Sequence, residues 1–167
     1  MAVAPWTVSD ELWGLVEPLL PKRERSRPGG RSRHPDRQTL SGILFVLHTG
    51  IAWRHLPQEL GFGSGVTCCR RLDEWQRVGV WERLHGLLLE RLRAAGQRGI
   101  KPKIARRQTA HGPGLGRYRW VVERTFAWLH QFRRLLVRYD RRADIHEGFL
   151  AIGCCLICWR RLSETTK

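Results

Sequence analysis

Apolar side chains recur along this sequence at the spacing of an α-helix, and that periodicity constrains the fold more strongly than any other feature. The clearest example lies between residues 121 and 136. Its members fall at i, i+4, i+7, i+8, i+11 and i+15, namely Val121, Thr125, Trp128, Leu129, Phe132 and Leu136. Positions with this spacing lie on one face of a helix. We therefore predict a mainly α-helical protein.

The first 95 residues divide into four segments with helical spacing, and glycine or proline separates them. Helices are expected at about residues 10–20, 36–49, 64–78 and 80–94. Thr7 or Ser9, Asp36 and Ser64 are the expected N-terminal caps of the first three. The second helix is apolar almost all round, which favours a position at the centre of a bundle. The fourth is expected to bury Trp81, Leu84, Leu87, Leu88 and Leu92.

The third of these helices combines a buried stripe with a basic side. Cys68, Leu72 and Trp75 fall at i, i+4 and i+7 and form the predicted stripe. The residues expected to face elsewhere are Thr67, Arg70, Arg71, Glu74 and Arg77. Short helices joined by glycine turns, with arginines on the third, are typical of a helix-turn-helix module. A plain helical bundle with solvated arginines fits the same spacing, so both interpretations stay open.

The charge balance indicates a polyanionic partner. The 167 residues include 30 Lys and Arg against 15 Asp and Glu, which gives a formal net charge of +15. Nucleic-acid binding explains this excess, whereas an enzyme acting on small metabolites does not need it. Arginine predominates, and its guanidinium suits bidentate contacts with phosphate and guanine. The alternative is a generic basic protein from a genome rich in G and C.

Neither a signal peptide nor a membrane span is expected. The longest apolar run, residues 149–159, is too short to cross a bilayer. Five cysteines in an unsecreted chain indicate reduced thiols and a cytoplasmic location. Cys155 and Cys158 have the spacing of a metal or redox pair, but they lie inside the apolar run without a second pair. We interpret them as small buried side chains.

Basic residues dominate the segment from Arg91 to Val122, which contains nine Lys or Arg and no carboxylate. Within it, residues 99–105 are a candidate for one short strand, which Pro102 would confine to a sheet edge. A last helix is expected at residues 145–162 with Asp144 as its cap.

Several longer strings resemble the DDE transposases of bacterial insertion sequences, in the group of the fourth and fifth families. Residues 35–47 (PDRQTLSGILFVL), 49–53 (TGIAW) and 61–67 (GFGSGVT) resemble the N-terminal helical domain of that family. Residues 99–102 (GIKP), 114–116 (GLG) and 119–130 (RWVVERTFAWLH) resemble the end of its catalytic domain. Together these strings cover most of the chain.

The resemblance implies a ribonuclease-H-like core in which two aspartates and a glutamate hold two divalent metal ions, Mg²⁺ in intact relatives. Glu123 corresponds to the glutamate, with Arg119 four residues before it. Gly116 and His130 stand where the family signature has a tyrosine and a basic residue. The long family segment that carries both aspartates is missing between the parts resembling residues 87–96 and 97–105. We therefore expect no metal site, and we interpret Glu123 as a surface partner of Arg119.

Three regions follow from these observations. We expect a helical DNA-binding domain at residues 1–95, a basic linker at 96–112 and a two-helix remnant of the catalytic domain at 113–162. The predicted function is that of a transposase-family protein that binds DNA without cleaving it. Two alternatives stay open, a non-functional remnant of a decayed element and a fragment active only with an intact transposase.

The expected partner is double-stranded DNA, with the terminal repeats of an element as the candidate target and no membrane. We expect a cytoplasmic, nucleoid-associated protein that forms a homo-oligomer or a mixed oligomer with an intact transposase. No cofactor is expected for this chain, although Mg²⁺ is implied for intact relatives. The residues predicted to contact DNA are Arg31, Arg33, Arg37, Thr67, Arg70, Arg71, Lys101, Lys103, Arg106, Arg107 and Arg119.

Overall fold

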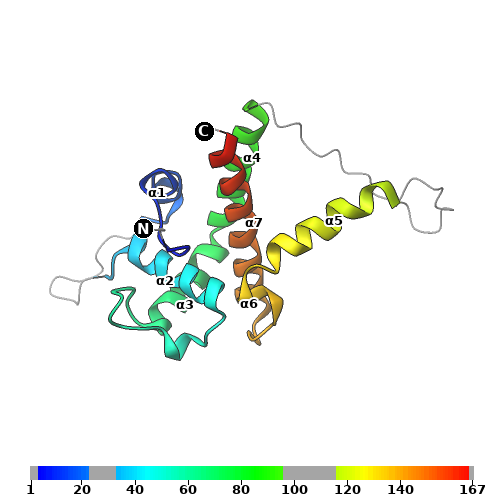
Figure 1. Ribbon diagram of the computed structural model, residues 1–167. Helices are drawn as coiled ribbons and strands as arrows, with labels where there is room; N and C mark the ends of the chain where they lie inside the picture. The colour runs from blue at the N-terminus through cyan, green and yellow to red at the C-terminus, as the bar shows by residue number, and fades with distance from the viewer. Residues whose placement is uncertain (1–3, 23–32, 96–115, 166–167) are drawn as a thin grey trace.

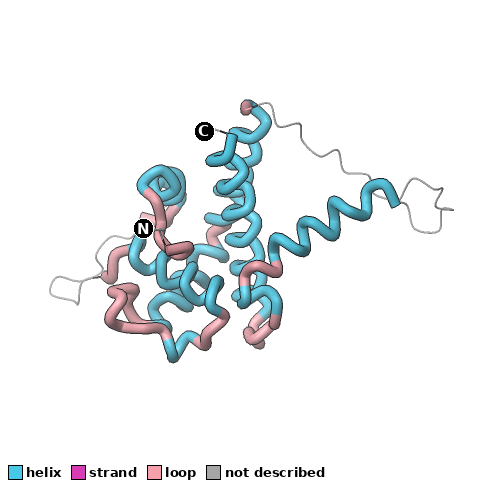
Figure 2. Tube along the Cα trace, viewed as in Figure 1, coloured by secondary structure: helices cyan, strands magenta, loops and turns pink. Residues whose placement is uncertain are grey.

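The computed structural model describes residues 4–22, 33–95 and 116–165, and every regular element within these ranges is helical (Figures 1 and 2). The elements are α1 (Asp10–Val16), the 3₁₀ turn η1 (Glu17–Leu19), α2 (Asp36–Thr49), the 3₁₀ turn η2 (Trp53–His55), α3 (Gly65–Arg77), α4 (Val80–Ala94), α5 (Gly116–Leu129), α6 (Arg133–Leu136) and α7 (Ala143–Thr165). The prediction of a mainly α-helical protein is confirmed. The candidate strand at residues 99–105 lies outside the described residues, and a relation to a ribonuclease-H-like core stays a prediction.

Local sequence explains where the N-terminal helices begin and end. The Ser9 hydroxyl accepts a hydrogen bond from the Leu12 amide at 3.2 Å, so Ser9 caps α1 as predicted. Gly50 ends α2 in the left-handed conformation, with φ of 73°. The prediction that Asp36 caps α2 is wrong. Asp36 is itself the first helical residue, and its carboxylate binds the Arg71 guanidinium instead.

The hydrophobic core joins α2, α3 and α4 to the last helix. α4 and α7 run side by side in the same direction (Figure 1). The Cys155 thiol donates a hydrogen bond to the Trp81 carbonyl oxygen at 3.4 Å. Gly148 lies so close to α3 that a Cβ there would be 3.0 Å from Leu72 Cδ1. The division into three regions stays a prediction, and one core contains residues from both outer regions.

α7 begins two residues before its predicted start. Asp144 therefore lies in the first turn and is not the cap, although its carboxylate accepts a hydrogen bond from the Ile145 amide at 3.0 Å. In α4 the expectation that Leu87 is buried is also wrong, because that side chain is exposed, whereas Leu92 is half-buried. None of the described helices is long and apolar enough to cross a membrane.

The longest predicted periodicity is interrupted. α5 ends at Leu129 and α6 begins at Arg133, and between them Phe132 turns inward against His48, with ring centroids 5.0 Å apart. Because Phe132 is buried against α2, the chain bends after α5 and residues 121–136 do not form one continuous helix. Leu136 therefore does not lie on the predicted apolar face and is exposed. Thr125 is exposed as well. α5 projects from the other helices (Figure 1), and Phe126 on it is 56% exposed.

Candidate nucleic-acid interface

The glycine-rich loop before α3 fixes where that helix begins. Gly63 has φ of +81°, a conformation that other residues adopt only with strain. A Cβ on Gly65 would collide with the carbonyl oxygen of Trp53, so α3 can start against η2 only with glycine at this position. The Ser64 hydroxyl then accepts a hydrogen bond from the Thr67 amide at 3.1 Å, which confirms the predicted cap.

The predicted stripe of α3 is confirmed, because Cys68, Leu72 and Trp75 are all fully buried. The first turns of the opposite side face solvent. Val66 is 61% exposed, and Arg70 is exposed one turn further on. Within the part of the chain that the structure describes, Arg70 has no hydrogen bond or ion pair to another residue. Its guanidinium is therefore available to an external ligand.

Thr67 is less available than Arg70. Its side chain is half-buried, and its hydroxyl lies 2.9 Å from the Ser64 hydroxyl, so the two form a hydrogen bond. Thr67 therefore helps to hold the start of α3.

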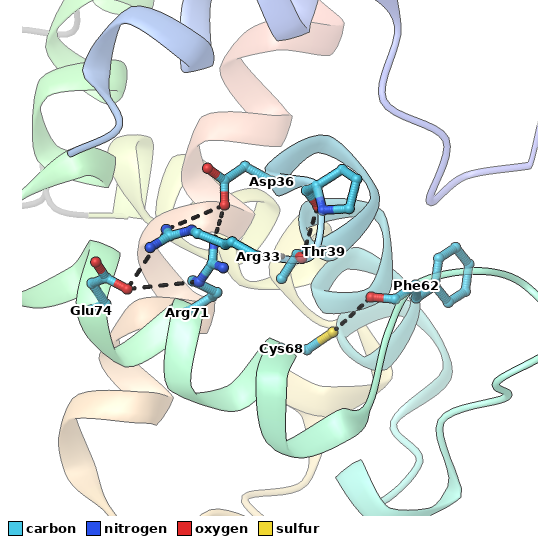
Figure 3. A network of polar contacts seen from close by, with 8 residues as sticks. Arg33, Asp36, Thr39, Phe62, Cys68, Arg71 and Glu74 are labelled. Carbon is cyan, nitrogen blue, oxygen red and sulfur yellow. Dashed lines mark hydrogen bonds and ion pairs between the residues drawn. The ribbon is translucent and has the colours of Figure 1, made fainter. Parts of the chain in front are cut away.

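Arg71 does not face solvent, contrary to prediction. Its side chain is 9% exposed, and its guanidinium forms an ion pair with Asp36 and lies 3.7 Å from a Glu74 carboxylate oxygen (Figure 3). Arg33 lies beside the same carboxylates, 3.3 Å from Asp36 and 3.8 Å from Glu74. A guanidinium can be buried here because two carboxylates compensate its charge. These four residues, Arg33, Asp36, Arg71 and Glu74, are called the Asp36 cluster below.

Arg37 also has protein partners. Its guanidinium donates to the Val8 carbonyl oxygen at 2.7 Å and lies 2.6 Å from an Asp10 carboxylate oxygen, so it ties α2 to the residues around the start of α1. Three predicted DNA contacts, Arg33, Arg37 and Arg71, thus take part in contacts between segments of the protein.

The remaining predicted DNA contacts are not brought together in the described structure. Arg31, Lys101, Lys103, Arg106 and Arg107 lie outside the described residues. Arg119 belongs to α5, but its side chain also lies outside what the structure describes.

Two further arginines, which sequence reasoning did not single out, organise the start of α7. Arg134 is 4% exposed and holds Asp140 through two hydrogen bonds, of 3.0 and 2.8 Å. It also donates to the carbonyl oxygens of Gly50 and Ile51, at 3.3 and 3.1 Å. Arg134 therefore fastens the segment after α6 to the end of α2. The only sequence signal was the six-residue separation from an aspartate, which is too common to be diagnostic.

Arg142 links the same segment to α3. Its guanidinium lies 2.6 Å from an Asp73 carboxylate oxygen and also pairs with Asp144. The hydrogen bond from Arg142 lowers the pKa of Asp144 to about 2. Asp73 in turn lies 3.0 Å from Arg77 of its own helix. The outward side of α3 therefore ends in a group of paired charges.

All five aspartates of the sequence are ion-paired with arginine. The pairs are Asp10–Arg37, Asp36–Arg71, Asp73–Arg142, Asp140–Arg134 and Asp144–Arg142. Glu123 is exposed on α5. Within the described ranges, no three His, Cys, Asp or Glu side chains are arranged to hold a metal ion. The described residues therefore do not fit the pair of metal ions that the family resemblance implies.

The two spaced cysteines of α7 do not form a reactive pair. Cys155 is buried as predicted, and Cys158 is half-buried. Burial raises the pKa of Cys155 to about 12 and also raises the pKa of Cys158. Both thiols therefore stay protonated near neutral pH, and a protonated thiol is a poor metal ligand and nucleophile.

Comparisons with known proteins account for both halves of this architecture. The family model of transposases of the IS4/5 family matches residues 8–85, and the model of the transposase DDE domain matches residues 70–159. The chain is 44% identical over 164 residues to the protein named as the transposase for insertion sequence element IS402 of Burkholderia cepacia, which covers 96% of this chain and 77% of that protein. It is 60% identical over 92 residues to an uncharacterized 16.2 kDa protein of the same element, which covers 54% of this chain and 63% of that protein. No solved structure matches. The chain belongs to the IS4/5 family of DDE transposases.

Proposed function

We propose that this chain binds double-stranded DNA and does not cut it. The observation that carries the absence of cleavage is that all five aspartates are ion-paired with arginines. No aspartate is therefore placed to bind a metal ion together with Glu123. Strand cleavage by two metal ions needs several carboxylates that converge on the metals. One exposed glutamate cannot organise two ions.

The comparison with the IS402 transposase does not explain the missing ligands. The IS402 transposase aligns with 96% of this chain over only 77% of its own length, so it is the longer protein. Because the aligned stretch is 164 residues long and takes in 96% of this chain, the extra length of the relative lies outside that stretch. The loss of an internal segment with the two aspartates is therefore proposed from the family resemblance alone.

DNA binding is supported by the net charge of +15 and by the exposed side of α3. α3 carries Arg70 without a protein partner in the described structure, next to the exposed Val66. An exposed helix with arginine and apolar side chains on its first turns suits the major groove, where arginine recognises guanine. The terminal repeats of an insertion element are the proposed preferred target.

A salt titration of binding tests the first half of the proposal. Purified protein is retained on a filter with labelled duplex DNA from 50 to 300 mM salt. If about six phosphates are neutralised, the logarithm of the affinity should fall with the logarithm of salt at a slope of roughly −5. An affinity that does not change with salt would contradict electrostatic DNA binding.

The same DNA is then incubated with protein and either Mg²⁺ or Mn²⁺ and examined on a denaturing gel. We expect binding without nicks. Nicks that require metal would contradict the second half of the proposal. Nicks that appear only after an intact relative is added, and exceed those made by the relative alone, would favour action in a mixed oligomer.

A further inference from the structure

A cleft lies between η2, α3 and the loop from Val137 to Arg142, and the function proposed above does not use it. Its volume is about 520 Å³, and its walls include Trp53, Cys69, Tyr139, Arg141 and Arg142. Tyr139 is 59% exposed at its edge, and Trp53 stacks on Phe149 with ring centroids 5.5 Å apart. The wall of the cleft therefore combines aromatic side chains with a basic side, called its rim below, to which Arg141 and Arg142 belong.

Three arginines line the cleft, namely Arg134, Arg141 and Arg142, and among them Arg141 is the one without a partner in the described structure. Arg134 forms an ion pair with Asp140. Arg142 forms ion pairs with Asp73 and Asp144. The Nε of Arg138 donates a hydrogen bond to the Asp140 carbonyl oxygen at 3.2 Å. Arg141 is exposed and, in the described part of the chain, has neither a hydrogen bond nor an ion pair. The nearby aspartates are thus neutralised, and Arg141 contributes an uncompensated positive charge.

The loop and α3 are held as one surface. Arg142 reaches Asp73 of α3 at 2.6 Å, and Asp73 lies three residues after Arg70 on the same side of the helix. Cys69, next to Arg70 in the chain, lines the cleft together with Arg141. A DNA duplex that receives the exposed side of α3 in its groove would therefore pass its sugar-phosphate backbone along this loop.

We propose that the Arg141 rim of the cleft binds a backbone phosphate of duplex DNA beside the groove occupied by α3. This inference rests on the proposed DNA-binding function. Arg70 and Arg141 would then do different work, because base contacts specify sequence whereas phosphate contacts only position the protein. The loop from the C-terminal part of the chain would complete an interface that begins in the N-terminal helices.

The test compares Arg141→Ala with Arg93→Ala. The second substitution removes the same charge at the C-terminal end of α4, which lies far from α6 (Figure 1). Arg141→Ala should weaken binding to all duplex sequences about five- to tenfold at 0.1 M salt and reduce the salt slope by about one. Arg93→Ala should leave the slope unchanged. Arg141→Lys should keep the wild-type slope, because it keeps the charge.

The outcomes separate this inference from the proposed function. If the wild-type protein binds with the expected salt dependence but Arg141→Ala and Arg93→Ala behave alike, the phosphate contact is wrong and DNA binding stands. If wild-type protein does not bind duplex DNA, the proposed function itself is wrong. A loss in Arg141→Ala that is confined to one sequence would overturn the phosphate assignment and indicate a base contact.

Discussion

The Arg71 guanidinium is ion-paired with the Asp36 carboxylate, and this contact fastens α3 to the first turn of α2. Replacing Arg71 by alanine would leave Arg33 as the partner of Asp36 within the cluster. Glu74 would lose its buried partner. Removing one partner of a fully buried ion pair lowers the free energy of unfolding by about 3–5 kcal/mol. Because Asp36 is partly solvated, we expect Arg71→Ala to lower it by about 1–3 kcal/mol. The loss should appear as a lower urea midpoint of unfolding.

Arg70→Ala is the matched control, since it removes an adjacent arginine that has no partner in the described structure. We expect its urea midpoint to match that of the wild-type protein. Equal midpoints for Arg70→Ala and Arg71→Ala would mean that the Asp36 cluster contributes nothing to stability.

Glycine at position 65 should be indispensable for packing α3 against η2. Gly65→Ala places a methyl group on the Trp53 carbonyl oxygen, which is backbone and cannot move aside cheaply. We expect a loss of more than about 2 kcal/mol, comparable to overpacking a core. Gly86→Ala is the control, because a Cβ in α4 at that position meets nothing within 4 Å. It should stabilise the protein by about 0.5–1 kcal/mol, because alanine is the better helix former. Equal effects of the two substitutions in chemical unfolding would refute the close approach.

Helical spacing was sufficient to predict where most of the helices lie. Ser9 and Ser64 cap helices as expected, and the stripe of Cys68, Leu72 and Trp75 is buried. These features depend on residues close together in the chain. Local patterns therefore identified them correctly.

Long-range partners could not be predicted in this way. Helical spacing placed Arg71 outside the buried stripe and among the DNA contacts, but Asp36, which pairs with it, lies 35 residues earlier in the chain. Phe132 interrupts the predicted periodicity because it packs on His48, on a different helix. The cleft beside Arg141 likewise arises only when η2, α3 and the loop before α7 come together.

His48 should make the protein sensitive to mild acid. Burial, with a smaller contribution from the Arg160 charge, lowers the pKa of His48 from 6.5 to about 4. In the unfolded chain the His48 imidazole binds a proton as the pH falls below 6.5, whereas in the folded protein it does so only near pH 4. Stability is fully present above pH 6.5 and falls as the pH drops towards 4. Because the ring is only half-buried, we expect a loss of about 1–2 kcal/mol.

Urea unfolding at pH 7.5 and pH 4.5 measures this effect. His48→Leu cannot be protonated at this position, so its stability should fall less than that of the wild-type protein between the two pH values. Parallel losses in both proteins would assign the acid sensitivity to other groups.

Arg70 should control sequence preference. Because we place it at the bases, Arg70→Ala should reduce discrimination between element ends and random duplex by about 1–3 kcal/mol. Lys22→Ala, in the basic segment before α2, should instead weaken binding to both DNAs alike. Competition titrations with the two duplexes measure the ratio of the affinity for element ends to the affinity for random duplex. If that ratio changes equally in both variants, α3 does not read the sequence.

Glu123 is the residue whose substitution separates a lost active site from an intact one. Positioned metal ions contribute several kcal/mol to the transition state of strand cleavage, and each 1.36 kcal/mol is tenfold in rate. With the aspartates held by arginines, Glu123→Gln should change neither DNA retention on filters nor the background of nicks with Mg²⁺ or Mn²⁺. The same substitution at the corresponding glutamate of an intact relative should abolish cleavage, which makes that relative the positive control. Metal-dependent nicking by this chain that disappears in Glu123→Gln would mean that carboxylates from a second subunit complete the site.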